Sequence, residues 1–125
     1  MHETARRWWD GCLAGVEGVC LAWAVMLGFV RIATNRKIVA RPPGVGEVMA
    51  RIEGWLELPR VHVVQPSDAH FSRLRDTLER LGTAGTMTAD AHLAVLAMGR
   101  GYVLYSMDAD FARFAGLRWI NPRRR

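Results

Sequence analysis

Short β-rich runs alternate along this chain with segments of helical periodicity, and this alternation restricts the folds that the chain can adopt. The runs read VCLAW from Val19, VHVV from Val61, YVLYS from Tyr102 and LRWIN from Leu117. Strands that are separated by helices usually pair in parallel, and the helices then cover both faces of the sheet. The sequence therefore predicts a small α/β sandwich built on a parallel sheet.

Apolar residues at helical spacing predict five helices. In the first, which begins almost at Met1, they recur at i, i+3, i+4, i+7, i+8 and i+11: Ala5, Trp8, Trp9, Cys12, Leu13 and Val16. The other helices are expected at residues 24–33, 45–56, 68–81 and 89–98. Ser67 is expected to cap the fourth helix, and Gly82 to end it. The side chains expected on its buried face are Phe71, Leu74, Leu78 and Leu81.

Length, charge and cysteine content limit the class of protein. We expect residues 1–125 to form a single domain with one core. The net charge of +5 favours nucleic acid as a partner, then an anionic membrane, although the terminal run 123–125 is equally well explained as a solubilising end. Cys12 and Cys20 form no metal-binding pattern, which indicates a reducing compartment. The uncharged run from Gly18 to Val30 is shorter than the about 20 residues that span a bilayer, so we expect a cytoplasmic protein without membrane contact.

Isolated acids stand at the ends of apolar elements. Asp90 lies near the start of the fifth helix, which is apolar nearly all round and therefore interior, and Asp108 and Asp110 follow the third β-rich run. A lone acid at a helix start usually caps free N–H groups. Sites in parallel sheets, however, lie beyond the carboxyl ends of the strands, so these three acids are expected near one rim.

Clustered carboxylates repel one another unless a cation holds them. Hard oxygen ligands suit Mg²⁺ or Mn²⁺, which can activate water and neutralise charge that develops on a phosphodiester. His92 lies two positions from Asp90 and would point in a different direction on a helix. We therefore expect His92 to be packed or hydrogen-bonded rather than to bind a metal.

The order of these motifs resembles PIN-domain ribonucleases, specifically the VapC toxins of bacterial toxin–antitoxin pairs. The matching pieces span essentially the whole chain: HETARRWW, LAWAVMLGFVRIATN, TADAHLAVLA and SMDADFARFAGLRWINP, of which the last two are the most specific. The resemblance implies a three-layer α/β/α sandwich and an endoribonuclease that needs Mg²⁺ or Mn²⁺. It also implies RNA as substrate, a cognate VapB-like antitoxin and a toxin homodimer.

The family's site residues carry over to three positions of this sequence. Asp90 matches the metal-binding acid of the helix motif, Asp108 matches the acid after the following strand, and Asp110 is a nearby acid of the same motif. The resemblance thus implies Asp90 and Asp108 as catalytic residues and all three acids as metal ligands.

Two departures from the family pattern affect these expectations. Family members begin with a hydrophobic strand that ends in a metal-binding Asp, and no such strand precedes the first helix here. Gly28 stands where members often have Glu. We therefore expect a PIN-like domain that is N-terminally truncated. Two explanations are open for the missing strand: Met1 is an internal methionine and the true start lies upstream, or the chain is a damaged toxin. We favour the first.

Three functions remain open at this point. The first is a metal-dependent endoribonuclease toxin. The second is an inactive truncated toxin that binds antitoxin or RNA without cleaving. The third is a haloacid-dehalogenase-like phosphatase, suggested by the D-x-D that follows YVLYSM. It is disfavoured because that motif belongs on a first strand, and only 15 residues follow Asp110.

Overall fold

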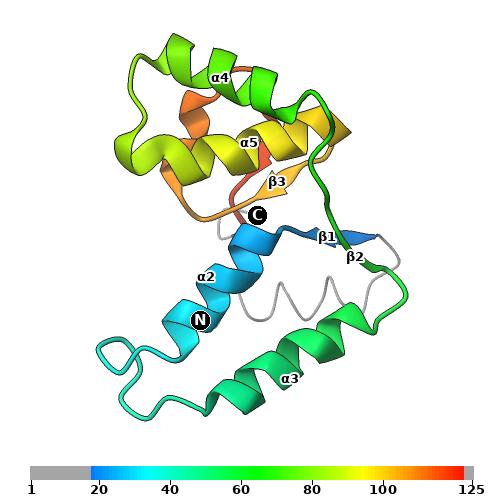
Figure 1. Cartoon of the computed structure of the whole chain (residues 1–125), viewed down its shortest axis with the longest axis vertical. Coiled ribbons are helices and arrows are strands. Elements are labelled where there is room, and N and C mark those ends of the chain that lie inside the picture. Colours follow the sequence, from blue (N-terminus) through cyan, green and yellow to red (C-terminus); the bar gives the residue numbers. More distant parts are fainter. Residues whose placement is uncertain (1–17, 123–125) are drawn as a thin grey trace. The chain divides into compact units, whose positions relative to one another are not determined.

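The computed structural model describes residues 18–122, which fall into two compact units, one of residues 18–64 and the other of residues 65–122. The helix expected near Met1 lies outside the described residues. Both units contain parallel strands flanked by helices (Figure 1). The predicted α/β class with parallel pairing is therefore confirmed.

The first unit is built from four elements in chain order: β1 (Val19–Leu21), α2 (Trp23–Ala33), α3 (Val45–Leu56) and β2 (Val61–Val63). Strands β1 and β2 pair in parallel, with Val19 opposite Val61 and Leu21 opposite Val63. The core of this unit is formed by buried side chains from all four elements: Leu21, Met26, Ile52 and Val61.

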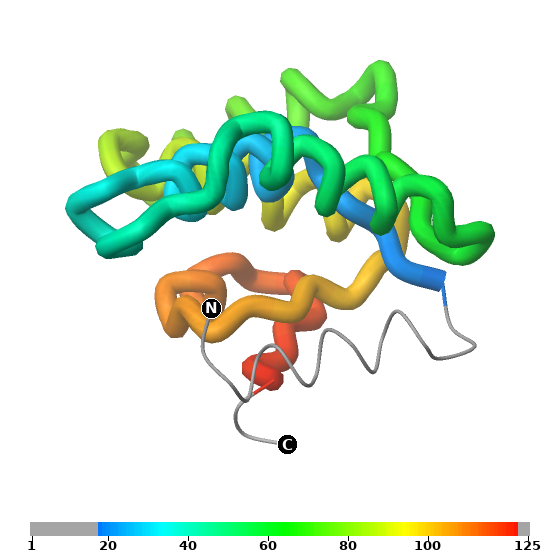
Figure 2. The backbone as a smooth tube through the Cα atoms, turned by 90° about the horizontal axis from the view of Figure 1, so that it is seen from below, coloured from blue at the N-terminus to red at the C-terminus, as the bar shows by residue number. Residues whose placement is uncertain are grey.

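The second unit begins with α4 (His70–Leu81), followed by the 3-10 turn η1 (Gly85–Met87) and α5 (Thr88–Arg100). It continues with β3 (Leu104–Tyr105), a second 3-10 turn η2 (Ala109–Arg113) and β4 (Trp119–Ile120). Strands β3 and β4 pair in parallel. In Figure 2 the segment from β3 through η2 to β4, in orange and red, folds back on itself.

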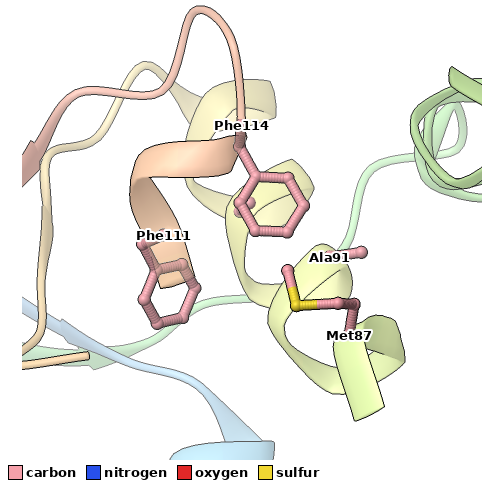
Figure 3. Packing of buried hydrophobic residues seen from close by; sticks show 5 residues of the cluster. Met87, Ala91, Phe111 and Phe114 are labelled. Carbon is pink, nitrogen blue, oxygen red and sulfur yellow. The ribbon is translucent and has the colours of Figure 1, made fainter. Parts of the chain in front are cut away.

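Helix α5 is the interior helix of the second unit, as its apolar sequence predicts. Ala91 and Ala94 are fully buried, and the rings of Phe111 in η2 and of Phe114, which caps the end of η2, lie beside this helix together with Met87 (Figure 3). The small alanine side chains let the two aromatic rings come close to the helix backbone. This packing fixes η2, and with it the acids at the start of η2, relative to α5.

Two local predictions about α4 are wrong. The helix begins at His70 with Ala69 as N-cap, and Ser67 contributes only its backbone carbonyl, which accepts a 3.0 Å hydrogen bond from the His70 N–H. Phe71 is 75% exposed rather than buried. At 100° per residue Phe71 lies about 120° around the helix from Thr77, which is buried, so the core-facing side is rotated away from Phe71.

The predicted end of α4 is confirmed. Gly82 has φ +74°, a left-handed conformation that glycine adopts without the steric penalty of a Cβ, and its N–H bonds back to the helix carbonyls.

None of the helices described between residues 18 and 122 is both long enough and apolar enough to cross a membrane.

Gly28 in the middle of α2 offers a test of helix stability. A Cβ built at this position would meet no atom within 4 Å. We expect Gly28→Ala to raise the free energy of unfolding by about 0.5–1 kcal/mol, because alanine loses less backbone entropy in a helix. Denaturant unfolding measures the change. Gly82→Ala is the opposite control and should destabilise the chain, so a matching gain at both positions would contradict this explanation.

Candidate metal centre

Asp90 is placed by the first turn of α5. The helix begins at Thr88, whose hydroxyl donates a 2.9 Å hydrogen bond to the Gly85 carbonyl and thereby joins η1 to α5. Within the described chain, no side chain caps the free N–H groups of α5. The capping role that would most simply explain an acid at this position is therefore not the one Asp90 has, although its charge still complements the helix dipole.

Asp108 and Asp110 are placed by the start of η2. Asp108 is the N-cap of this turn, and its Oδ1 accepts a 2.9 Å hydrogen bond from the backbone N–H of Asp110. The Asp108 N–H in turn donates to the Ser106 hydroxyl at 3.1 Å. A further bond runs from the Trp119 indole N–H to the Ser106 carbonyl, at 2.9 Å. The loop that carries both acids is thus held at its backbone from several sides.

Asp90 precedes Asp108 and Asp110 by 18 residues or more in the sequence, yet the three acids lie together in the structure. Asp90, Asp108 and Asp110 each offer one carboxylate oxygen, and these oxygens all lie within 4.8 Å of one another. Asp90 is half-buried, while Asp108 and Asp110 are exposed. The expectation that the ends of the helix and the strand bring these acids to one rim therefore agrees with the geometry.

The cluster concentrates negative charge. Burial raises the pKa of the Asp90 carboxyl above its ordinary value of 3.8, and the neighbouring charges of Asp108 and Asp110 raise it further. Among residues 18–122, none of the three acids has an ion-pair partner, since the ion pair found there joins Arg75 to Glu79. A divalent cation would relieve this repulsion. Three carboxylates that converge from two elements are the hard-oxygen set that Mg²⁺ or Mn²⁺ binds, so these residues fit such an ion.

His92 is a hydrogen-bonded histidine, as its position on the helix predicts. Its Nδ1 lies 2.9 Å from Nε2 of His70, and the two rings meet nearly at right angles. The pair connects the start of α4 to α5. Burial, and secondarily the proximity of His92, lowers the pKa of His70. Nothing in the sequence pattern indicates this pairing, because the two residues are 22 positions apart and belong to different helices.

The raised pKa of Asp90 leads to a prediction about stability without metal. A carboxyl whose pKa is higher in the folded state destabilises the fold once it is ionised, and this effect is absent at a pH below its ordinary pKa. We therefore expect Asp90→Asn to raise the free energy of unfolding of the metal-free chain at neutral pH. This gain should shrink as the pH falls toward 3.8.

Chemical unfolding in EDTA at several pH values measures this difference. Asp76→Asn removes one exposed acid of α4 outside the cluster, and we expect it to leave the free energy of unfolding within about 0.5 kcal/mol of the unmodified chain. A loss of stability in Asp90→Asn at neutral pH would show that the Asp90 carboxylate is stabilised by its surroundings, contrary to the electrostatics of the cluster.

Comparison with known proteins identifies the family. Residues 1–117 match the PIN domain family. Ribonuclease VapC37 of Mycobacterium tuberculosis is 37% identical over 121 residues, which cover 97% of this chain and 84% of that protein. Ribonuclease VapC31 of the same species is 35% identical over 97% of this chain and 85% of its own length. Ribonuclease VapC33, also of Mycobacterium tuberculosis, is 33% identical over 98% of this chain and 86% of its own length. The chain therefore belongs to the PIN-domain family, and VapC ribonucleases are among its relatives.

Proposed function

We propose that this chain is the toxin component of a type II toxin–antitoxin system, an endoribonuclease that needs Mg²⁺ or Mn²⁺ and cleaves phosphodiester bonds of RNA. The observation that carries the proposal is that one carboxylate oxygen from each of Asp90, Asp108 and Asp110 lies within 4.8 Å of the other two. The names of the relatives, which are ribonucleases of the VapC type, support the reaction and the substrate. The match to the PIN family over residues 1–117 supports a single PIN-like domain over residues 1–125.

In this proposal Asp90, Asp108 and Asp110 are the metal ligands, and Asp90 and Asp108 are the catalytic residues. When bound, the divalent cation would neutralise charge on the phosphodiester and increase the acidity of a water molecule. The hydrogen bond from the Asp110 N–H to Oδ1 restrains the Asp108 carboxylate, which would otherwise rotate freely as an exposed side chain. Asp90 comes from the rigid helix α5, so the distance between the two carboxylates depends on how η2 packs against that helix.

The partners of the proposed toxin are its RNA substrate, a VapB-like antitoxin and a second copy of the chain, with the cytoplasm as the place of action. Large apolar side chains on the first unit support a protein partner. Trp23 and Leu27 of α2 are 57% and 62% exposed, and Val45 of α3 is 62% exposed. Trp23 and Leu27 stand one turn apart on α2, and exposed apolar side chains that are neighbours in this way are typical of protein interaction surfaces.

Incubating the purified chain with single-stranded RNA, in Mg²⁺ or in EDTA, tests the proposed reaction. We expect cleavage products in Mg²⁺ and none in EDTA. Cleavage that is insensitive to EDTA would contradict the metal-dependent mechanism. RNA that is bound but remains intact in Mg²⁺ and in Mn²⁺ would instead identify the chain as a binding module.

A further inference from the structure

A shallow surface depression lies between the start of α4 and the end of α5, away from the first turn of α5 where Asp90 stands. Its polar lining comes from Ser67, His70, Arg73 and Arg100. No carboxylate is among the residues of the described chain that line it. The depression is therefore lined by two arginines, one from each helix, and by no acid among the described residues.

Both arginines lie against backbone, and Arg100 is bonded to it. The Nη1 atom of Arg73 lies 3.0 Å from where a Cβ would stand on Gly99, so its guanidinium uses the space that this glycine leaves open. Arg100 donates from Nε and Nη2 to the Gln65 carbonyl, at 3.2 and 2.8 Å. These bonds leave the Nη1 group of Arg100 free of any described hydrogen bond within residues 18–122.

A neighbouring arginine on the same helix shows the usual alternative. Arg75 forms an exposed ion pair with Glu79 one turn further along α4, at 3.2 Å. Arg73 has no ion pair of this kind within residues 18–122. A phosphate group at this depression would face arginines from both helices, and its oxygens accept several charge-assisted hydrogen bonds from guanidinium groups at once.

We propose that Arg73 and Arg100, in the depression that Ser67 and His70 also line, bind a phosphate group of RNA at a site separate from the acid cluster. This inference rests on the proposed function, because it takes RNA as the substrate. Gly99 is nine residues beyond Asp90 on α5, which corresponds to about 14 Å along the helix. The site would therefore hold a phosphate of the flanking strand rather than the phosphodiester that is cleaved.

The salt dependence of RNA binding tests this site. A fluorescently labelled single-stranded RNA is titrated with the full chain in EDTA, at NaCl concentrations from 50 to 300 mM, so that binding is measured without cleavage. Losing one phosphate contact should reduce the slope of log K against log salt by about 0.7, which corresponds to roughly fourfold weaker binding at 0.15 M salt. We expect this change for Arg73→Gln.

Arg75→Gln is the matched control, because it removes the same charge from the same helix outside the depression. We expect it to keep the unmodified slope. Equal slopes in all three proteins, or equal losses in both variants, would overturn the proposed site. Arg100→Gln should repeat the Arg73→Gln result, with circular dichroism checking that loss of the Gln65 bonds leaves the fold intact.

Two further measurements separate an RNA contact at this site from binding of free phosphate and from the proposed nuclease activity. Inorganic phosphate is titrated alone and followed by NMR at the amides of Gly99 and Arg100. If phosphate binds there while RNA affinity is the same in Arg73→Gln, the site serves free phosphate, and the proposed RNA contact is wrong. If the chain cleaves RNA in Mg²⁺ but Arg73→Gln leaves binding unchanged, this inference fails while the proposed nuclease function stands. Weaker RNA binding by Arg73→Gln in a chain that does not cleave would support the site and contradict the nuclease.

Discussion

Asp90→Asn is expected to lower Mg²⁺-dependent RNA cleavage by about 10²–10³-fold, because one of three carboxylates that hold the cation becomes neutral. Asparagine keeps the size of the side chain and can still offer a carbonyl oxygen. The loss therefore reports charge rather than packing. Since the same change is expected to raise the stability of the metal-free chain, a fall in activity cannot be attributed to unfolding.

Cleavage rates over a range of Mg²⁺ concentrations measure this effect. Asp108→Asn should produce a loss of similar size, and both variants should need more Mg²⁺ for half-maximal rate than the unmodified chain. Asp76→Asn, an exposed acid on α4, serves as the control and should cleave normally. If Asp90→Asn retains most of the activity at every Mg²⁺ concentration, the catalytic centre lies elsewhere in the chain.

Periodicity in the sequence predicted most of the secondary structure because burial imposes it locally. The apolar run around Ala91 and Ala94 could only be an interior helix, and the structure buries both residues completely. Strand lengths were less well predicted. The run YVLYS suggests five residues, but β3 contains only Leu104 and Tyr105, because a strand extends only as far as its partner β4 pairs with it.

The acid cluster could be anticipated because it follows from topology. A helix start and a strand end can be located in a sequence, and parallel topology brings such ends to one rim. The contact between His70 and His92 could not be anticipated, and neither could the position of Arg73 against Gly99. Both contacts depend on the rotation of α4 about its own axis. The apolar pattern of the helix did not determine that rotation, since it predicted a buried Phe71 and the side chain is exposed.

The second large effect is expected at the aromatic pair that holds η2 against α5. Phe111 and Phe114 are 4% and 5% exposed, and their ring centroids are 6.1 Å apart. Phe111→Ala should lower the free energy of unfolding by about 3–5 kcal/mol, because it removes a buried ring and leaves a cavity beside Ala91 and Met87. This is a large share of the about 5–15 kcal/mol that stabilises a typical domain.

Phe71→Ala is the matched control, because the same side chain is removed from a site that is 75% exposed. We expect it to change the free energy of unfolding by no more than about 0.5 kcal/mol. Equal destabilisation by the two variants would contradict the packing of η2 described above.

The smaller change Phe111→Leu keeps the interior filled and should leave enough folded protein for an activity measurement. Asp108 and Asp110 stand at the start of the turn that Phe111 anchors, so a looser η2 should displace both carboxylates relative to Asp90. We therefore expect Phe111→Leu to raise the Mg²⁺ concentration needed for half-maximal cleavage, while Phe71→Leu leaves it unchanged. An unchanged Mg²⁺ requirement in a measurably destabilised Phe111→Leu would show that the acids are positioned independently of this core.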